Sequence, residues 1–189
     1  PTEGTVTIGR QSLQKISFKE WRKHCGVVMQ EGFIFGDTIA NNIVPDGNMI
    51  DKKRLLYAVE MANIRDFVES LPLKYNTKIG NTGQGLSQGQ KQRILIARAI
   101  YRNPDYLFFD EATNALDTDN EKVIQGNLEK FFKDKTVVIV AHRLSTVKNA
   151  DQIVVLKEGE ITEKGTHDEL ITRQGDYYRL VKNQLELSA

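Results

Sequence analysis

Short apolar runs lie toward both ends of the chain and predict buried β-strands. Most of them are continuous stretches of β-branched or aromatic residues, which is typical of strands covered on both faces in a parallel sheet. The segment KEGEI at residues 157–161 predicts a tight turn into a further short strand. We predict strands at residues 5–8, 26–29, 106–109, 136–140 and 152–156.

The middle of the chain has helical spacing instead. Within residues 51–71, Leu55, Val59 and Ala62 fall on one apolar stripe. Strand–helix units at both ends and helices between them predict an α/β sheet interrupted by a helical subdomain. Ser/Thr-x-x-Glu/Gln capping boxes predict helix starts at Ser17/Glu20, Ser87/Gln90, Thr118/Glu121 and Thr166/Glu169.

The balanced charge argues against nucleic-acid binding. The 189 residues include 26 Lys and Arg and 25 Asp and Glu, so the net charge of +1 predicts no broad basic face. This length suits one domain with a substantial core and room for a subdomain. The single cysteine, Cys25, is expected to act as a small buried hydrophobe. No apolar run approaches the roughly 20 residues that span a bilayer, so any work at a membrane is expected to go through a partner.

One predicted strand ends in two adjacent carboxylates, Asp110 and Glu111. In doubly wound sheets the carboxyl ends of the strands form the ligand crevice. Two buried negative charges there are costly unless a cation or hydrogen-bond donors compensate them. A divalent metal fits, because one carboxylate can hold Mg²⁺ while its neighbour orients a water molecule. Helix capping by either residue is the alternative.

Two more predicted strands end in polar side chains. His142 follows the run at 136–140, and Gln30 follows the run at 26–29. Taken alone, a strand-end histidine is more often structural, and a glutamine there is more often a solvated loop residue. Three strands that all end in groups suited to phosphate and metal are a stronger signal than any one of them.

The stretch GQGLSQGQKQRILIARAI at residues 83–100 predicts a helix whose start can meet an anion. A capping box explains Ser87 and Gln90 without any ligand. It does not explain Gly89, which costs roughly 0.5–1 kcal/mol relative to alanine in the first turn. Glycine permits close approach, and the free amides and positive dipole end favour a phosphate. The free energy that a helix end contributes to binding an anion is at most ~2 kcal/mol. Even millimolar affinity requires a binding free energy of ~4 kcal/mol, so the helix end can only complete a phosphate site.

Three segments resemble the nucleotide-binding domain of ABC transporters: LSQGQ (86–90), YLFFDEATNALD (106–117) and AHRLST (141–146). The likeness extends over nearly the whole chain. VVMQEGFIFGDTIANNI (27–43) looks like the glutamine loop of ABC exporters, and TKIGNTGQG (77–85) looks like the exporter loop before the signature motif.

The resemblance implies an α/β fold with a P-loop NTPase-like (RecA-like) core, a mostly parallel sheet and an inserted helical subdomain. It assigns residues 1–36 and 104–189 to the ATPase core. Residues 37–103 would form the helical subdomain, which ends in the signature motif.

The resemblance also implies catalytic and metal-binding roles. Asp110 would be the Mg²⁺-associated aspartate of the Walker B strand, and Glu111 would be the general base for the attacking water. His142 would be the switch histidine that contacts the γ-phosphate of ATP. Gln30 would reach the metal or the water and report on contact with the membrane domain.

Other roles concern a second subunit. Ser87, Gly89 and Gln90 belong to the signature motif, which in this family meets the γ-phosphate of ATP held by the opposite subunit. Asp117 would lie in the loop that crosses the dimer interface. The helix start at Ser87 would therefore complete another chain's site.

The sequence departs from the family pattern at three points. Gln88 stands where the signature usually has glycine, and Asn114 replaces a commoner serine; both changes are expected to be mild. The third departure is serious, because the sequence contains no G-x-x-x-x-G-K-S/T motif and no Gly-Lys dipeptide. The opening PTEGTVTIG resembles the segment that follows the P-loop helix in this family. We therefore expect an N-terminally truncated piece that neither binds ATP measurably nor hydrolyses it alone.

The resemblance implies the ATP-hydrolysing, energy-coupling module of an ABC exporter that dimerises around ATP and Mg²⁺. Its expected partners are a second nucleotide-binding domain and the exporter's transmembrane domain, at the cytoplasmic face of the cell (inner) membrane. One alternative is a soluble, non-transport ABC-type ATPase acting on DNA or ribosomes, but those usually carry long insertions that this chain lacks. Another is a non-catalytic interaction module, against which the retained Glu111 and His142 argue.

Overall fold

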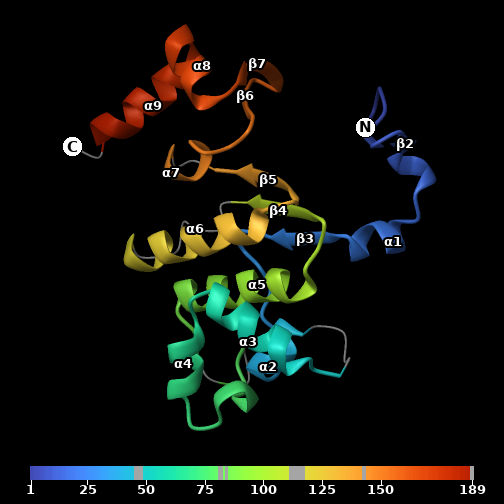
Figure 1. Cartoon of the computed structure of the whole chain (residues 1–189), viewed down its shortest axis with the longest axis vertical. Helices are drawn as coiled ribbons and strands as arrows, with labels where there is room; N and C mark the ends of the chain where they lie inside the picture. The colour runs from blue at the N-terminus through green and yellow to red at the C-terminus, as the bar shows by residue number, and fades with distance from the viewer. Residues whose placement is uncertain (45–48, 81–82, 84, 111–117, 142–143, 188–189) are drawn as a thin grey trace. The chain divides into compact units, whose positions relative to one another are not determined.

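The computed structural model describes residues 1–44, 49–80, 83, 85–110, 118–141 and 144–187 (Figure 1). Contacts divide the chain into two compact units, Pro1–Val138 and Ile139–Ala189. The predicted split into an ATPase core and a helical subdomain is a different division and stays a prediction. Within the described ranges, none of the helices combines the length and apolar character needed to cross a bilayer.

The central sheet has three strands in the order β3 (Cys25–Val28), β4 (Tyr106–Asp110) and β5 (Thr136–Val140). Strands β3 and β4 are parallel, and Val28 aligns with Phe109. All three strands coincide within a residue or two with runs predicted from the sequence. The α/β fold with a parallel sheet is therefore confirmed.

The sheet buries only one of its faces well, which corrects the prediction of strands covered on both faces. Val28, Leu107 and Phe109 are buried, whereas Val27 and Met29 are each 56% exposed. Successive side chains of a strand point to opposite faces, so this alternation means that one face is packed and the other is open. Helix α5 (Gln88–Arg102) packs against β3 (Figure 1).

The N-terminal segment forms a small separate sheet. The run predicted at 5–8 shortens to β1 (Thr7–Ile8), which pairs antiparallel with β2 (Gln11–Ser12). A 3₁₀ turn, η1 (Leu13–Lys15), and helix α1 (Phe18–Lys23) follow.

The capping box predicted at the start of α1 is wrong. Ser17 occupies the N-cap position, but its side chain accepts no capping hydrogen bond. Glu20 is instead engaged by Lys23, whose Nζ donates to Glu20 Oε1 at 2.8 Å. The Glu20 carboxylate therefore pairs with Lys23 instead of closing a box with Ser17.

The segment between β3 and β4 contains helices joined by loops, and among its described residues the only β-structure is a single bridge between Thr38 and Lys78. The predicted apolar stripe of Leu55, Val59 and Ala62 is confirmed, because all three residues are buried. In chain order the elements are α2 (Ile39–Ile43), α3 (Lys52–Met61), α4 (Arg65–Ser70), the 3₁₀ turn η2 (Lys74–Asn76) and α5.

Helix α6 (Thr118–Phe132) belongs to the first unit and precedes β5, whose residues fall on both sides of the boundary between the units. The second unit contains α7 (Leu144–Val147), the antiparallel strands β6 (Ile153–Lys157) and β7 (Glu160–Gly165), α8 (His167–Arg173) and α9 (Asp176–Leu187). The predicted tight turn lies between β6 and β7, where Glu158 and Gly159 have φ of 52° and 85°. Such a pair of left-handed residues matches the twist of a two-residue hairpin.

The second unit has its own small core and a helix start that matches the sequence. Buried Ile153, Val155, Leu170, Tyr177 and Val181 form one apolar cluster. The capping box predicted at the start of α8 is present, with both reciprocal hydrogen bonds between Thr166 and Glu169 formed.

Candidate functional site

Helix α5 begins with the predicted capping box. Ser87 Oγ accepts a hydrogen bond from the Gln90 amide at 3.2 Å, and Gln90 Oε1 accepts one from the Ser87 amide at 2.9 Å. The two side chains therefore fix each other and start the helix with a defined direction. Ser87 is exposed, and Gly89 and Gln90 are half-buried.

This helix start leaves amides for a ligand. The capping box uses the amides of Ser87 and Gln90, while Gln88 and Gly89 lie in the first turn, where amides have no acceptor within the helix. Those amides point along the helix axis toward its N-terminal end, which is the positive end of a 15-residue dipole. The geometry therefore suits an oxyanion presented from outside the chain.

Gln30 and Asp110 lie at one edge of the sheet. Asp110 is the last residue of β4, and Gln30 follows β3 by two residues. Because β3 and β4 are parallel and Val28 aligns with Phe109, their carboxyl ends meet at the same edge. Both side chains are exposed. The structure thus places the two residues that the sequence suggested for a metal at the same edge of the sheet.

A Mg²⁺ site with only a few protein ligands fits these two residues. Mg²⁺ keeps several waters and is commonly held by one or two carboxylates together with substrate phosphates. Among the described residues there is no cluster of three or more His, Cys, Asp or Glu side chains that would form a cage made of protein alone. The carboxylate of Asp110 and the amide oxygen of Gln30 match a Mg²⁺ site in which the protein supplies few ligands and the phosphates and waters supply the rest.

Three other predicted site residues, Glu111, Asp117 and His142, lie outside the described residues. Asn114, the departure in the same loop, does too. The geometry of the candidate site therefore rests on the α5 start and on the strand ends that carry Gln30 and Asp110.

One side of α5 holds the segment that follows β3. Gln92 Nε2 donates to the main-chain oxygen of Met29 at 3.5 Å, next to Gln30. Three residues further along α5, Leu95 packs so tightly over Gly32 that a Cβ at Gly32 would overlap the leucine side chain. The helix that starts at Ser87 thus also positions the segment that carries Gln30.

Arg98 makes the strongest of these attachments. Its Nε donates to the main-chain oxygen of Asn42 at 2.6 Å, and its Nη1 donates to the main-chain oxygen of Phe33 at 3.0 Å. The guanidinium also lies 5.2 Å from the ring centre of Phe35. Burial lowers the pKa of Arg98, although an arginine stays charged throughout the physiological range.

Asn42 completes the attachment from the other side. It is fully buried, its Oδ1 accepts from the Phe35 amide at 2.8 Å, and its Nδ2 donates to the Phe35 oxygen at 3.0 Å. Nearby, hydrogen bonds from the Thr38 amide and the Asn41 side chain hold the pKa of Asp37 below its usual value. Polar contacts therefore fix the segment from Phe33 to Asn42 almost completely.

The sequence analysis missed this network. A signal was present, because Gln92 and Arg98 interrupt the otherwise apolar buried side of α5, where a polar residue needs a partner. The partners, however, are main-chain oxygens from a segment that lies more than fifty positions earlier in the chain. Residue types alone do not reveal such partners.

Comparison with known proteins identifies the family. The sequence model described as "ABC transporter" matches residues 1–114. The chain is 46% identical over 184 residues to "ATP-binding cassette sub-family B member 5" of Mus musculus, covering 97% of this chain and 15% of that protein. It is 42% identical over 185 residues to the "ATP-dependent lipid A-core flippase" of Syntrophus aciditrophicus (strain SB), covering 98% of this chain and 31% of that protein.

A solved structure agrees with these matches. The chain superposes on the "Structure of a bacterial Atm1-family ABC exporter with ATP bound" with a TM-score of 0.92 and 37% sequence identity, over 97% of this chain and 32% of that one. This chain thus spans less than a third of the length of each of these proteins. The matches and the parallel α/β sheet agree: the chain belongs to the ABC transporter family.

Proposed function

We propose that this chain is part of the ATP-hydrolysing, energy-coupling module of an exporter. The observation that carries the proposal is that one helix, α5, positions both the helix start at Ser87 and the segment that carries Gln30. Helix α5 presents its open, capped end at Ser87 and also fixes the chain beside Gln30 through Gln92 and Arg98. The similarity to an exporter solved with ATP bound supports the same proposal.

In this proposal the sheet edge holds the metal and the water. Asp110 and Gln30 would supply oxygen ligands to Mg²⁺, which when bound would neutralise charge on the phosphates of ATP. Glu111 takes the proton of the attacking water as general base. His142 donates a hydrogen bond to the γ-phosphate.

In the proposed dimer, the start of α5 contributes to the ATP site of the opposite subunit. Ser87, Gly89 and Gln90 face the γ-phosphate of ATP held by an opposite nucleotide-binding domain, and Asp117 lies near the interface between the two. The exposed Ser87 and the free amides of the first turn support this arrangement. The other proposed partner is the transmembrane domain of an exporter, which this module meets at the cytoplasmic face of the membrane, and the coupled work is export of a substrate.

These residues alone are not expected to bind ATP. The 189-residue sequence contains no G-x-x-x-x-G-K-S/T motif, whose backbone and lysine hold the phosphates in this class of ATPase. The α5 start contributes at most about 2 kcal/mol, short of the roughly 4 kcal/mol that millimolar affinity requires. Titration calorimetry of the chain with MgATP should therefore show no binding, and micromolar binding would contradict this part of the proposal.

The proposed activity is tested in a protein that joins these residues to a P-loop segment. There, Glu111→Gln should lower ATP turnover by about 10²- to 10⁴-fold and leave ATP binding intact. Glu160→Gln makes the same chemical change at an exposed position on β7 and should leave turnover unchanged. Full turnover in the Glu111→Gln protein would remove Glu111 from its proposed role.

A further inference from the structure

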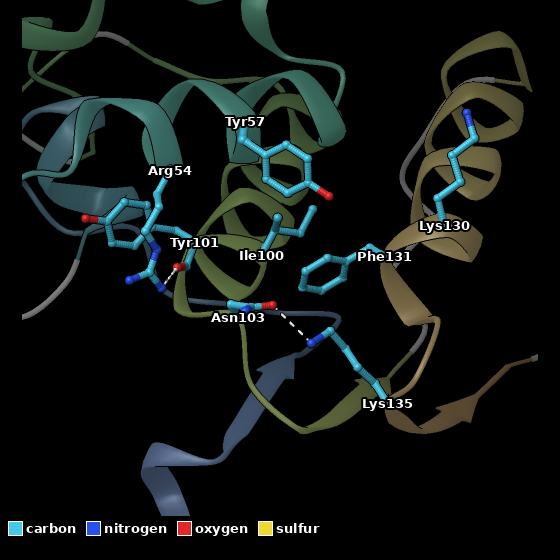
Figure 2. A pocket seen from close by; sticks show the side chains of 8 residues that line it. All are labelled: Arg54, Tyr57, Ile100, Tyr101, Asn103, Lys130, Phe131 and Lys135. Carbon is cyan, nitrogen blue, oxygen red and sulfur yellow. Dashed lines mark hydrogen bonds between the residues drawn. The ribbon is translucent and has the colours of Figure 1, made fainter.

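A cavity lies well away from Ser87, Gln30 and Asp110. It has a volume of about 460 Å³ and is bounded by α3, the C-terminal end of α5 and the C-terminal end of α6 with the turn that follows it (Figure 2). Small-molecule sites in proteins typically measure about 300–1,000 Å³. The cavity is therefore large enough for a small ligand, and it contains none of the residues proposed for ATP.

The apolar part of the cavity comes from three side chains. Ile100 is 2% exposed and Phe131 is 7% exposed, so both form a fixed wall. Tyr57, on α3, is 51% exposed, and Figure 2 shows its ring on the side of the cavity that faces α6. A half-exposed aromatic ring beside a fixed apolar wall offers a surface for a flat ligand.

Three cations, Arg54, Lys130 and Lys135, line the same cavity, and no acidic side chain does. Arg54 Nη2 donates to the main-chain oxygen of Tyr101 at 2.6 Å. Lys135 Nζ donates to Asn103 Oδ1 at 3.0 Å and to the Pro104 oxygen at 3.1 Å. These acceptors are uncharged, so the bonds orient two of the cations without neutralising them.

Capping of α5 explains part of this cluster. Cations at a helix C-terminus satisfy its last carbonyl groups, as Arg54 does for Tyr101, and Lys135 binds the side chain of the C-cap residue Asn103. Lys130 lies in the last turn of α6, where a cation also favours the helix dipole, but among the described residues it has neither a hydrogen bond nor an ion pair.

We propose that this cavity binds a small organic anion with a flat apolar body and a phosphate or carboxylate group. The apolar body packs between Tyr57 and the wall formed by Ile100 and Phe131. Figure 2 shows the Lys130 side chain extended away from Tyr57 and Ile100, so this flexible side chain turns toward the anionic group on binding. The anionic group then also lies within the field of Arg54 and Lys135. This binding site is independent of the proposed ATPase function.

The probe for the test is 1-naphthyl phosphate, titrated into the ¹⁵N-labelled chain and followed by backbone amide shifts. Saturable shifts should centre on Tyr57, Ile100 and Phe131. Inorganic phosphate lacks the apolar body and 1-naphthol lacks the charge, so each should bind at least several-fold more weakly. Equal binding of either compound, or shifts that do not saturate around these residues, would overturn the proposal.

Variants separate this site from general charge attraction. Lys130→Gln should weaken binding about 2- to 5-fold, the range of a single exposed ion pair, and Tyr57→Ala about 2- to 10-fold through the lost ring contact. Lys133→Gln removes the same charge from an exposed lysine that does not line the cavity, and should leave the affinity unchanged. An equal loss in Lys130→Gln and Lys133→Gln would contradict a defined site. A dispersed, wild-type-like amide spectrum for each variant confirms that folding is unchanged.

Discussion

Arg98 and Asn42 are joined by two hydrogen bonds across 56 positions of the chain. Arg98 Nε donates to the Asn42 main-chain oxygen at 2.6 Å, and Arg98 Nη2 donates to Asn42 Oδ1 at 3.2 Å. Asn42 is fully buried, so water has no access to replace either bond. This pair fixes the segment after β3 to the helix that begins at Ser87.

Removing the guanidinium should therefore destabilise the first unit. Arg98→Ala leaves buried acceptors on Asn42 without a donor, which costs about 1–3 kcal/mol. Urea unfolding of the wild type and the variant measures this difference. Arg102→Ala, at an exposed position four residues further along α5, should change stability by less than about 0.5 kcal/mol. Equal effects of the two substitutions would mean that the Arg98 contacts contribute nothing specific.

The close contact between Gly32 and Leu95 predicts a compensating pair of substitutions. Gly32→Ala should cost about 1–3 kcal/mol, because the new Cβ overlaps the side chain of Leu95, which is only 6% exposed and cannot move into solvent. Leu95→Ala should also be destabilising, by about 2–5 kcal/mol.

The double variant distinguishes this contact from two independent effects. With Leu95 shortened, the Cβ at position 32 has space, so the double variant should be more stable than the sum of the two losses by at least 0.5 kcal/mol. Thermal or urea unfolding of all four proteins gives this coupling energy. Strict additivity would show that the two residues do not restrict each other.

Two serines at helix starts should respond differently to alanine. Ser87 accepts a capping hydrogen bond, so Ser87→Ala should cost about 0.5–2 kcal/mol. Ser17 occupies the same position at α1 without a capping bond, and Ser17→Ala should be close to neutral. Chemical denaturation of both variants tests the difference, and a loss at Ser17 as large as the loss at Ser87 would contradict the hydrogen-bond assignment.

The open face of the sheet predicts self-association. Strand β3 is at one end of the three-stranded order and carries the exposed side chains of Val27 and Met29. An exposed apolar edge strand is a template for pairing with another chain. Sedimentation velocity should show a mass that increases with protein concentration.

A charge on that strand should reduce the association. Val27→Lys places a lysine on the exposed face of β3, whereas Val123→Lys makes the same change at a 49% exposed position on helix α6 and serves as the control. Only the β3 variant should shift the equilibrium toward the monomer. A wild-type chain that stays monomeric over a hundredfold range of concentration would exclude this prediction.

The sequence by itself determined the features that depend on neighbouring residues. The capping boxes at Ser87 and Thr166, the hairpin turn at Glu158 and Gly159, and the buried stripe of α3 all involve partners within a few positions. The order of the motifs was enough to indicate the ABC transporter family, because each motif is a short local pattern. Local patterns fail when another partner at the same spacing competes, as Lys23 does for Glu20 at the start of α1.

Only the tertiary structure decided which distant segments meet. The sequence contains Arg98, Asn42, Gln92 and Gly32, but nothing in their spacing shows that α5 holds the segment after β3. The open face of the sheet is also a tertiary feature, since an apolar run looks the same whether one of its faces or both are covered. In each case the energy comes from burial and hydrogen bonds between residues far apart in the chain, and these form only once the backbone has brought them together.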